Sequence, residues 1–277
     1  MSPGGSSQRL AVLIPVYNAE RGLERSLASL RGDGSEFEVF IVDDGSVPPL
    51  VVPEGLPFPV TLIRQPRNQG ITTALNAGLE QIVESGFQYI ARLDAGDLSL
   101  PGRFHTQMEF LDAHPDHAAV GTHVEVVDEN GRFIHLFNPP ANHREVLRRF
   151  RYENALGHPG VMMRAEALRA VGFYSEDYPG AEDYELWLRL ARSWKLANLD
   201  RVFVRKEKIR SSITGRRFRP ALSRLQIQLT HFTPLSIHAY LGIGLSVFAL
   251  VLSHDVVLRI RRLQGRWSTP VPRARDS

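Results

Sequence analysis

The sequence has no cysteine among its 277 residues. This absence excludes disulfide bonds, thiolate metal sites and a cysteine nucleophile, and it agrees with a reducing compartment. The first ten residues, MSPGGSSQRL, also lack the apolar core of a signal peptide. We therefore expect residues 1–8 to be a disordered lead-in to the first strand.

Sequence motifs of several common enzyme classes are missing as well. The chain contains no GxSxG, no GxxxxGK[ST] and no GxGxxG. Nucleophile-elbow hydrolases, P-loop enzymes and dinucleotide-binding proteins therefore have no support in the sequence. No internal repeat or low-complexity segment is present either, which leaves an ordinary globular domain as the expectation.

Charge is absent from one long stretch, residues 225–254, and unevenly distributed around it. Residues 201–277 hold 15 of the 33 Lys and Arg but only 3 of the 30 Asp and Glu. This asymmetry predicts a catalytic body followed by a basic and apolar helical segment, residues 206–277, that meets an anionic surface. No nucleic-acid-binding motif accompanies the basic residues, so a membrane is the expected surface and nucleic acid is not.

The apolar part of this segment, residues 235–252, is at the lower limit for crossing a bilayer. Basic flanks on both sides favour a helix lying in the interface over a single span, and so a peripheral or monotopic protein on the cytoplasmic face of the membrane. Small residues such as Ala239, Gly242 and Ser246 recur at helical spacing. They leave open a helix packed on the catalytic domain or in a homodimer.

Apolar runs and helical periodicity alternate along the first half of the chain. With short connections between them, they predict an α/β fold, a Rossmann-like, mostly parallel sheet with helices on both faces. The expected strands are residues 9–17, 37–42, 60–63, 89–93, 118–127 and 132–136, and the expected helices are residues 19–30, 68–84, 101–114 and 182–191.

Two acidic loops follow apolar runs: DDGS at residues 43–46 and DAGD at residues 94–97. In an open α/β sheet, ligands bind at the carboxyl ends of the strands. Carboxylates gathered there repel each other unless a cation lies between them. Oxygen ligands suit Mg²⁺ or Mn²⁺, which commonly bridge to a substrate phosphate. The loops therefore predict a metal–nucleotide site.

The ordered set of motifs resembles that of bacterial family 2 glycosyltransferases. The resemblance covers residues 9–205 and implies a GT-A fold that transfers sugar from a nucleotide donor with inversion. Several motifs in the expected order are more specific than any one of them. The motifs are LIPVYNAE (13–20), IVDDGS (41–46), RNQGITTALNAGL (67–79), RLDAGD (92–97) and AEDYELWLRL (181–190).

The resemblance assigns roles to the acids of the second loop. It implies that Asp97 is the metal ligand, on the diphosphate side, and that Asp94 lies on the ribose or close to the metal. A divalent cation there would stabilise the leaving nucleoside diphosphate as a Lewis acid. Many relatives carry a third acid where this chain has Gly96, so one metal or ribose contact is lost here.

The same resemblance implies a nucleoside pocket lined by Pro15, Tyr17, Asp43 and Asp44. An aspartate in such a pocket can accept a hydrogen bond from a base N–H or a ribose hydroxyl. The sequence leaves open which of Asp43 and Asp44 makes that contact.

An acidic pair opens the expected helix at residues 182–191. Inverting transfer needs one carboxylate to take the proton of the acceptor hydroxyl. The resemblance implies that Asp183 is this base and that Glu182 orients it or raises its pKa. The alternative is that both acids only cap the helix.

The expected function is transfer of a sugar, most simply from a UDP-sugar, to a glycan or lipid-linked acceptor of surface polysaccharide synthesis. Two alternatives remain: a catalytically silent relative that acts as a membrane-bound assembly partner, and a nucleotidyltransferase of similar fold. His158 precedes an apolar run and is expected to be a structural, hydrogen-bonded residue.

Overall fold

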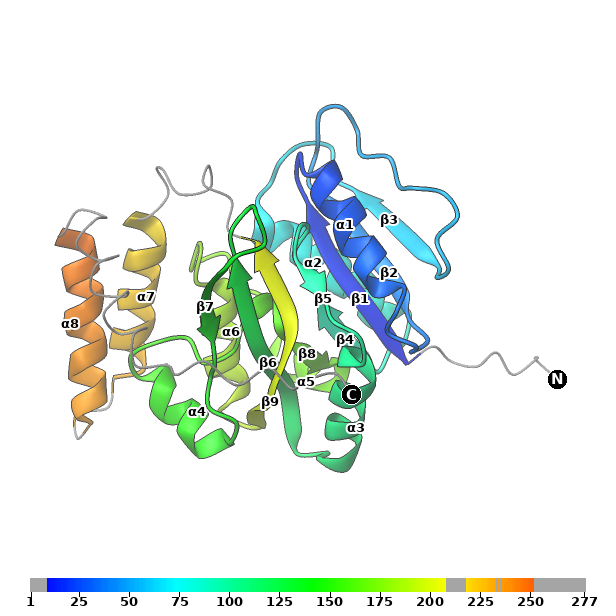
Figure 1. The fold of residues 1–277 in the computed structure, drawn as a ribbon. Coiled ribbons are helices and arrows are strands. Elements are labelled where there is room, and N and C mark those ends of the chain that lie inside the picture. Colours follow the sequence, from blue (N-terminus) through cyan, green and yellow to red (C-terminus); the bar gives the residue numbers. More distant parts are fainter. Residues whose placement is uncertain (1–8, 208–217, 233, 235, 252–277) are drawn as a thin grey trace.

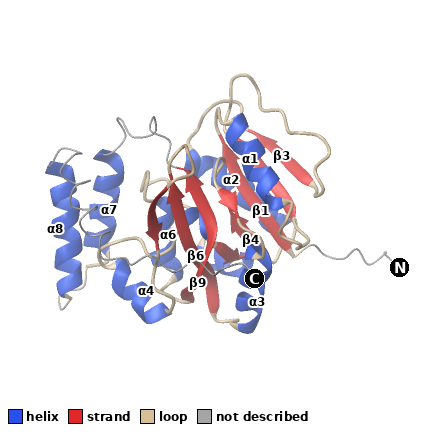
Figure 2. Ribbon diagram, viewed as in Figure 1, coloured by secondary structure: helices blue, strands red, loops and turns tan. Residues whose placement is uncertain are grey.

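The computed structural model describes residues 9–207, 218–232, 234 and 236–251. The expected lead-in and much of the expected basic segment, including residues 208–217 and 252–277, lie outside these ranges. A central sheet carries helices on both faces, and two C-terminal helices pack beside it (Figure 1). Figure 2 separates the helices from the strands of the sheet.

The first half of the sheet is parallel, as expected from the alternating pattern. Its strands lie in the order β3-β2-β1-β4, with β1 pairing in parallel to both β2 and β4. The elements are β1 (Leu10–Val16), α1 (Glu20–Leu30), β2 (Glu38–Asp43), β3 (Val60–Arg64), α2 (Ile71–Glu84) and β4 (Tyr89–Arg92).

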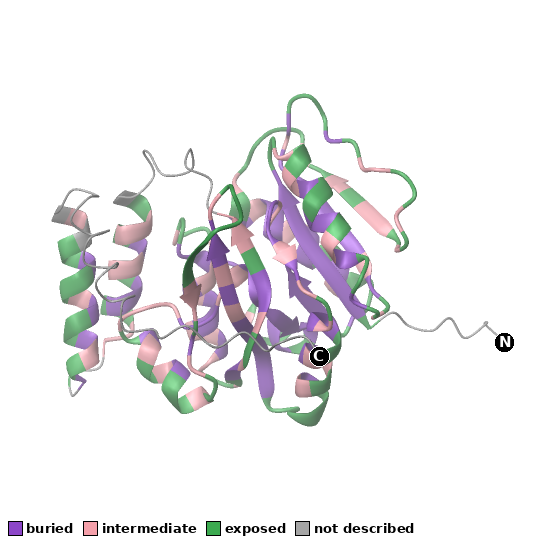
Figure 3. Ribbon diagram, viewed as in Figure 1, coloured by how far each residue is buried: buried purple, intermediate pink, exposed green. Residues whose placement is uncertain are grey.

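Strand β1 is buried along its whole length (Figure 3), because its two faces enter different cores. Leu10, Val12 and Ile14 pack with apolar residues of α1. Ala11 and Leu13 face α2 on the other side. A continuous apolar run, rather than an alternating one, is the sequence signature of a strand covered on both faces.

The second half of the sheet is mixed. Parallel pairing joins β6 to β9, whereas β8 is antiparallel to both β4 and β6, and β5 and β7 pair antiparallel at the edges. The elements are β5 (Leu98–Ser99), α3 (Arg103–Ala113), β6 (His117–Val127), β7 (Phe133–Phe137), α4 (His143–Phe150), the short 3-10 turn η1 (His158–Gly160), β8 (Met162–Arg164), α5 (Ala165–Val171), α6 (Glu182–Leu190) and β9 (Lys195–Glu207).

Two element boundaries differ from expectation in ways that affect the site. Helix α2 begins at Ile71 rather than at residue 68, because Gly70 has a φ of 94° and cannot continue a helix backwards. Strand β9 extends to Glu207, and its residue Lys206 pairs with Val126 of β6. Lys206 therefore belongs to the sheet and not to the helical segment that was expected to begin there.

The C-terminal helices α7 (Phe218–Thr230) and α8 (Ile237–Val251) form a pair that packs on the rest of the described fold. Ile227 of α7 joins the main core, and Ser223 donates a hydrogen bond to the carbonyl of Pro179. A Cβ added at Gly242 of α8 would lie 2.3 Å from the carbonyl oxygen of Arg151. The small-residue stripe therefore brings α8 close to the body, as the packed-helix alternative predicts.

Among the described residues, no helix is both long and apolar enough to span a bilayer.

Candidate active site

Asp43 is buried at the end of β2 and holds its own loop. Its carboxylate accepts hydrogen bonds from the backbone N–H groups of Ser46 (2.9 Å) and Leu50 (3.2 Å), and the Arg64 guanidinium lies 3.3 Å away. Burial acts to raise the pKa of Asp43, but these hydrogen bonds and the Arg64 charge outweigh it and lower the pKa. The Arg64 guanidinium also donates to the Leu50 carbonyl, so this arginine is engaged in the same loop.

Asp44 ties the end of β2 to the start of α2. Its two carboxylate oxygens accept from the backbone N–H groups of Gln69 (2.7 Å) and Gly70 (2.9 Å). The intervening Gly45 has a φ of 72°, and a Cβ there would lie 2.3 Å from the carbonyl carbon of Arg67. Asp44 and Gly45 of the DDGS motif are therefore needed for the structure of the loop itself, independently of any ligand contact.

The other two residues expected in the nucleoside pocket lie at the end of β1. Pro15 is buried within the strand, and Tyr17, the first residue after the strand, is 49% exposed. The adjacent Asn18 donates its backbone N–H to the Ser46 hydroxyl (2.9 Å) and accepts from the backbone of Val47 (2.9 Å). The loops after β1 and β2 are thereby joined, which places Tyr17 beside the DDGS loop.

The DAGD loop is held by a buried serine of α1. The Ser26 hydroxyl accepts a hydrogen bond from the backbone N–H of Gly96 (2.9 Å) and donates to the carbonyl of Asp97 (2.8 Å). Gly22, one turn earlier, allows close approach, since a Cβ there would lie 3.2 Å from the Gly96 nitrogen. Gly96 has a φ of 104°, a conformation that strains other residues and that accounts for glycine in place of a third acid.

We expect Ser26→Ala to lower the free energy of unfolding by about 1–3 kcal/mol, because the buried N–H of Gly96 loses its acceptor. Urea denaturation measures the change. Ser193→Ala, at an exposed serine after α6, is the matched control and should stay within about 0.5 kcal/mol of wild type. Equal stabilities of the two variants would show that Ser26 does not hold the loop.

The two acids of the DAGD loop share one lysine. The Lys206 ammonium lies 3.3 Å from Oδ2 of Asp94 and 3.5 Å from Oδ2 of Asp97. The other oxygen of Asp94 pairs with the buried Arg92 guanidinium at 2.5 Å. Burial acts to raise the pKa of Asp94, but Arg92 and Lys206 outweigh it and lower the pKa. Burial raises the pKa of Asp97 to about 6, although the Lys206 charge opposes the shift.

Asp94 and Asp97 provide suitable oxygen ligands for a divalent cation, but they do not form a complete metal site by themselves. The Lys206 ammonium shows that Oδ2 of Asp94 and Oδ2 of Asp97 converge on one cation, and carboxylate oxygens suit Mg²⁺ and Mn²⁺. In the described part of the chain, however, no group of three or more His, Cys, Asp or Glu side chains is placed to hold a metal. Further ligands would have to come from the donor diphosphate and water.

Asp183 opens α6, with Oδ1 accepting from the Tyr184 backbone N–H (2.7 Å) and Oδ2 from the Asn154 amide (2.8 Å). Burial, together with the charge of Glu182, raises the pKa of Asp183 to about 7. Glu182 is itself buried, and its Oε2 has no hydrogen-bond partner within the described residues. A carboxylate of this pKa accepts a proton readily near neutral pH.

A histidine–tyrosine pair lies near both the DAGD loop and the acidic pair of α6. Nε2 of His158 is 2.8 Å from the hydroxyl of Tyr174. Burial raises the pKa of Tyr174, and the charges of Arg92, Asp183 and Asp94 also act on its hydroxyl. Burial likewise lowers the pKa of His158 well below its usual value, with Arg92 acting in the same direction, which keeps the ring neutral. The structure therefore brings the DAGD loop and the acidic pair of α6 into one electrostatic neighbourhood.

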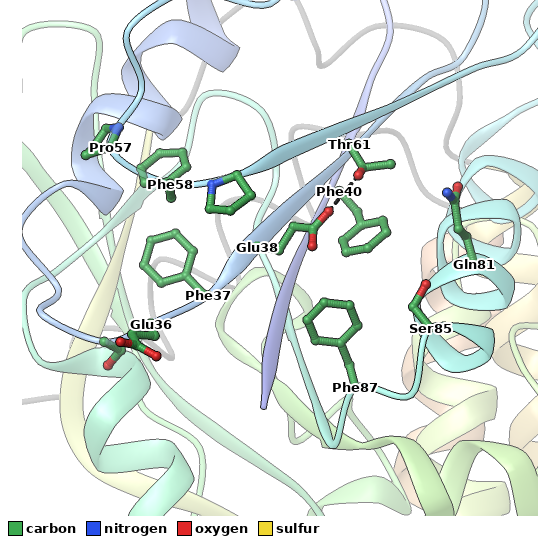
Figure 4. Close-up of a pocket in the computed structure, with 12 residues that line it drawn as sticks. Glu36, Phe37, Glu38, Phe40, Pro57, Phe58, Thr61, Gln81, Ser85 and Phe87 are labelled. Atoms are coloured by element: carbon green, nitrogen blue, oxygen red, sulfur yellow. Dashed lines mark hydrogen bonds between the residues drawn. The ribbon is translucent and has the colours of Figure 1, made fainter. Parts of the chain in front are cut away.

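A hollow of about 720 Å³ lies elsewhere, at the amino ends of β2 and β3 (Figure 4). It is lined by Glu38, Thr61, Phe58 and Phe87 among others, and Glu38 accepts a hydrogen bond from the Thr61 hydroxyl at 2.6 Å. Asp43 stands at the opposite end of β2. The hollow is therefore separate from the acidic site.

Sequence patterns do not predict several residues that support this site. Lys206 falls in the expected basic segment, because a linear sequence does not show that this lysine contacts Asp94 and Asp97. Ser26 and Asn154 are ordinary polar residues, and only their contacts distinguish them. Arg92 could have been noticed, since an arginine inside an apolar strand run needs a buried partner.

Comparison with known proteins identifies relatives of most of the chain. The model of the family "Glycosyl transferase family 2" matches residues 11–172. The amylovoran biosynthesis glycosyltransferase AmsE of Erwinia amylovora is 30% identical over 203 residues, covering 70% of this chain and 74% of AmsE. The O-antigen biosynthesis glycosyltransferase WbnJ of Escherichia coli is 31% identical over 109 residues, but the match covers only 39% of this chain and 42% of WbnJ.

Solved structures share the fold at low sequence identity. TarS 1–349 of S. aureus in complex with UDP-GlcNAc has a TM-score of 0.59 at 18% identity, covering 93% of this chain and 74% of that one. The mannosyltransferase PcManGT of Pyrobaculum calidifontis, in complex with GDP-Man and Mn²⁺, has a TM-score of 0.60 at 17% identity, covering 92% and 79%. These likenesses confirm the expected GT-A fold.

Proposed function

The chain belongs to glycosyltransferase family 2, and on that basis we propose that it transfers a sugar from a nucleoside diphosphate donor to a hydroxyl of a glycan or lipid-linked acceptor, with inversion. A UDP-sugar is the proposed donor, a proposal supported by the fold shared with UDP-GlcNAc-bound TarS. Surface polysaccharide synthesis is the proposed setting, because AmsE and WbnJ are named for amylovoran and O-antigen biosynthesis.

One observation carries the proposal: the charges of Asp94 and of Asp183 both act on the same hydroxyl, that of Tyr174. The proposed donor-side acid and the proposed base therefore lie near one hydroxyl, although they are 89 positions apart in the sequence. Transfer with inversion needs this arrangement, because the acceptor oxygen attacks the anomeric carbon from the side opposite the leaving diphosphate.

In the proposed reaction, Asp183 takes the proton of the acceptor hydroxyl as its oxygen forms a bond to the anomeric carbon. The bond from that carbon to the diphosphate breaks, and its electron pair leaves with the nucleoside diphosphate. Burial keeps the pKa of Asp183 high, and the charge of Glu182 adds to this effect. Asn154 holds the carboxylate of Asp183 in place. Inversion follows from the single displacement.

The proposed metal ligands are Asp97 and, beside it, Asp94. A bound Mg²⁺ or Mn²⁺ would supply Lewis-acid stabilisation of the leaving diphosphate. The proposal is supported by the convergent carboxylate oxygens and by the Mn²⁺ in the complex of PcManGT. On the nucleoside side, Tyr17 is exposed enough to contact a base, while Pro15, Asp43 and Asp44 shape the loops around it.

A donor screen tests the proposed function. Purified protein is mixed with UDP-, GDP-, TDP- and CMP-linked sugars in the presence of Mn²⁺, and thermal stabilisation and nucleotide release are measured. We expect one nucleoside diphosphate sugar to raise the melting temperature and to be hydrolysed slowly without acceptor. If no nucleotide sugar stabilises the protein or is turned over, the transferase proposal fails, and the silent-relative alternative is favoured.

We further propose that the outer face of α8 rests on an anionic membrane at the cytoplasmic side. Helix α8 has both buried and exposed positions (Figure 3): Ala239 and Ser246 are buried, whereas Ile237 is 78% exposed and Leu241 is 53% exposed. The chain after α4 contacts the start of α8, since Arg151 donates to the Ser236 hydroxyl (3.0 Å). Exposed Arg144 and Arg148 of α4 add further positive charge.

Vesicle flotation tests this placement. The full-length protein should float with phosphatidylserine vesicles. The double variant Leu241→Glu/Phe248→Glu should lose about 1,000-fold in binding, since each of the two buried side chains contributes roughly 2 kcal/mol. Val51→Glu, at an exposed apolar residue after β2, is the control and should bind as wild type. A protein that does not float but sediments as a dimer, with the dimer lost in the double variant, would instead support the homodimer.

A further inference from the structure

We propose that Lys206 is a cation built into the donor site: it neutralises the Asp94–Asp97 pair when the site is empty and binds the diphosphate of the donor, in competition with a divalent ion for the same carboxylates. The inference rests on the proposed function and deepens it. It predicts that nucleotide binding does not depend wholly on metal.

The position of Lys206 is fixed by contacts on both of its neighbours. Arg205 pairs in the sheet with Leu98 of β5, directly after the DAGD loop. The carboxylate of Glu207 forms an ion pair with Arg25 of α1. The end of β9 is therefore held against the same helix and loop that carry the acids, and the Lys206 ammonium reaches both carboxylates from a rigid base.

The second cation of the site cannot take this role. The Arg92 side chain is only 1% exposed, and it donates to the Leu93 carbonyl (2.6 Å) as well as to Asp94. The Lys206 side chain, in contrast, is 44% exposed, and it carries its ammonium on a flexible four-carbon stem. It can turn from the carboxylates toward an incoming phosphate while Arg92 continues to hold Asp94.

Electrostatics makes the ammonium and a divalent ion rivals. Both seek the point between Oδ2 of Asp94 and Oδ2 of Asp97, and like charges at such a distance repel strongly where the surroundings are partly buried. A metal that binds must therefore displace the Lys206 ammonium. The displaced ammonium then lies next to the position of the diphosphate, where phosphate oxygens are its natural acceptors.

The test compares Lys206→Met with Arg205→Met. Arg205 is the neighbouring cation of the same strand and is 45% exposed, but its side chain points to the opposite face and pairs with Glu125. Two quantities are measured on the full chain: Mn²⁺ affinity without nucleotide, by electron paramagnetic resonance, and UDP affinity in EDTA, by calorimetry. Circular dichroism and melting temperature show whether each variant is folded.

We expect Lys206→Met to bind Mn²⁺ about tenfold more tightly than wild type, because its carboxylates are freed, and UDP in EDTA about tenfold more weakly. Arg205→Met should change neither value. Unaltered Mn²⁺ affinity in folded Lys206→Met overturns the proposal. If UDP binds no form of the protein, the proposed donor is wrong, yet the Mn²⁺ comparison still decides whether Lys206 competes with metal for Asp94 and Asp97. Lys206→Arg, which keeps the charge, should retain UDP binding in EDTA.

Discussion

Replacement of Asp183 by asparagine is expected to lower the rate of sugar transfer by about 10³-fold and to leave nucleotide binding close to that of wild type. A general base acts in the transition state, so its loss reduces kcat far more than ground-state affinity. The amide of asparagine still offers an oxygen to the Tyr184 N–H and keeps the helix start intact. Steady-state kinetics and calorimetry with the nucleoside diphosphate measure the two effects.

The pH profile supplies the control. Because burial and the charge of Glu182 raise the pKa of Asp183 to about 7, turnover should fall as the pH drops below that value and Asp183 becomes protonated. Glu182→Gln removes the neighbouring charge, so the acid limb should move to lower pH while the variant stays active. If Asp183→Asn keeps more than a tenth of the activity and merely loses stability, Asp183 is a helix cap and not the base.

Removal of Asp97 is expected to weaken the binding of nucleoside diphosphate in Mn²⁺ by about 100-fold, the effect of losing one charge-assisted interaction of roughly 3 kcal/mol. Asp97 is buried beside the cation position, with its side chain 5% exposed. Calorimetric titration of wild type and Asp97→Ala, each in Mn²⁺ and in EDTA, measures the loss.

Comparison of the four titrations distinguishes the contribution of the divalent ion to nucleotide binding from that of the Lys206 ammonium. Wild type should bind more tightly in Mn²⁺ than in EDTA, and Asp97→Ala should show little difference between the two. The control Asp200→Ala removes an acid that is 89% exposed, and it should behave as wild type. Equal affinity in all four titrations would contradict a metal ligand at Asp97, and would leave Lys206 as the cation for the diphosphate.

Local sequence patterns predicted the architecture around the site, because the carboxyl ends of parallel strands lie at the same edge of a sheet. The runs before DDGS and DAGD became β2 and β4, on either side of β1, so their acidic loops had to meet at the carboxyl ends. The amphipathic pattern likewise predicted α6 and placed Asp183 in its first turn. Helix α4 was not predicted, because it has only eight residues. Its start is nevertheless capped by Asn142, whose side chain accepts a hydrogen bond from the backbone N–H of Glu145 (3.1 Å).

By itself, the sequence determined which acids are offered to the site, because hydrophobic periodicity sets the strands and a strand end sets the place of the loop that follows it. Tertiary structure alone decided what those acids meet. Lys206 reaches Asp97 across 109 positions of the chain, and His158 reaches Tyr174 across 16, through strand register and loop packing that no local pattern encodes. Burial acts to raise the pKa of both Asp94 and Asp183, but the charges of Arg92 and Lys206 outweigh it at Asp94 and lower that pKa, whereas the charge of Glu182 adds to it at Asp183.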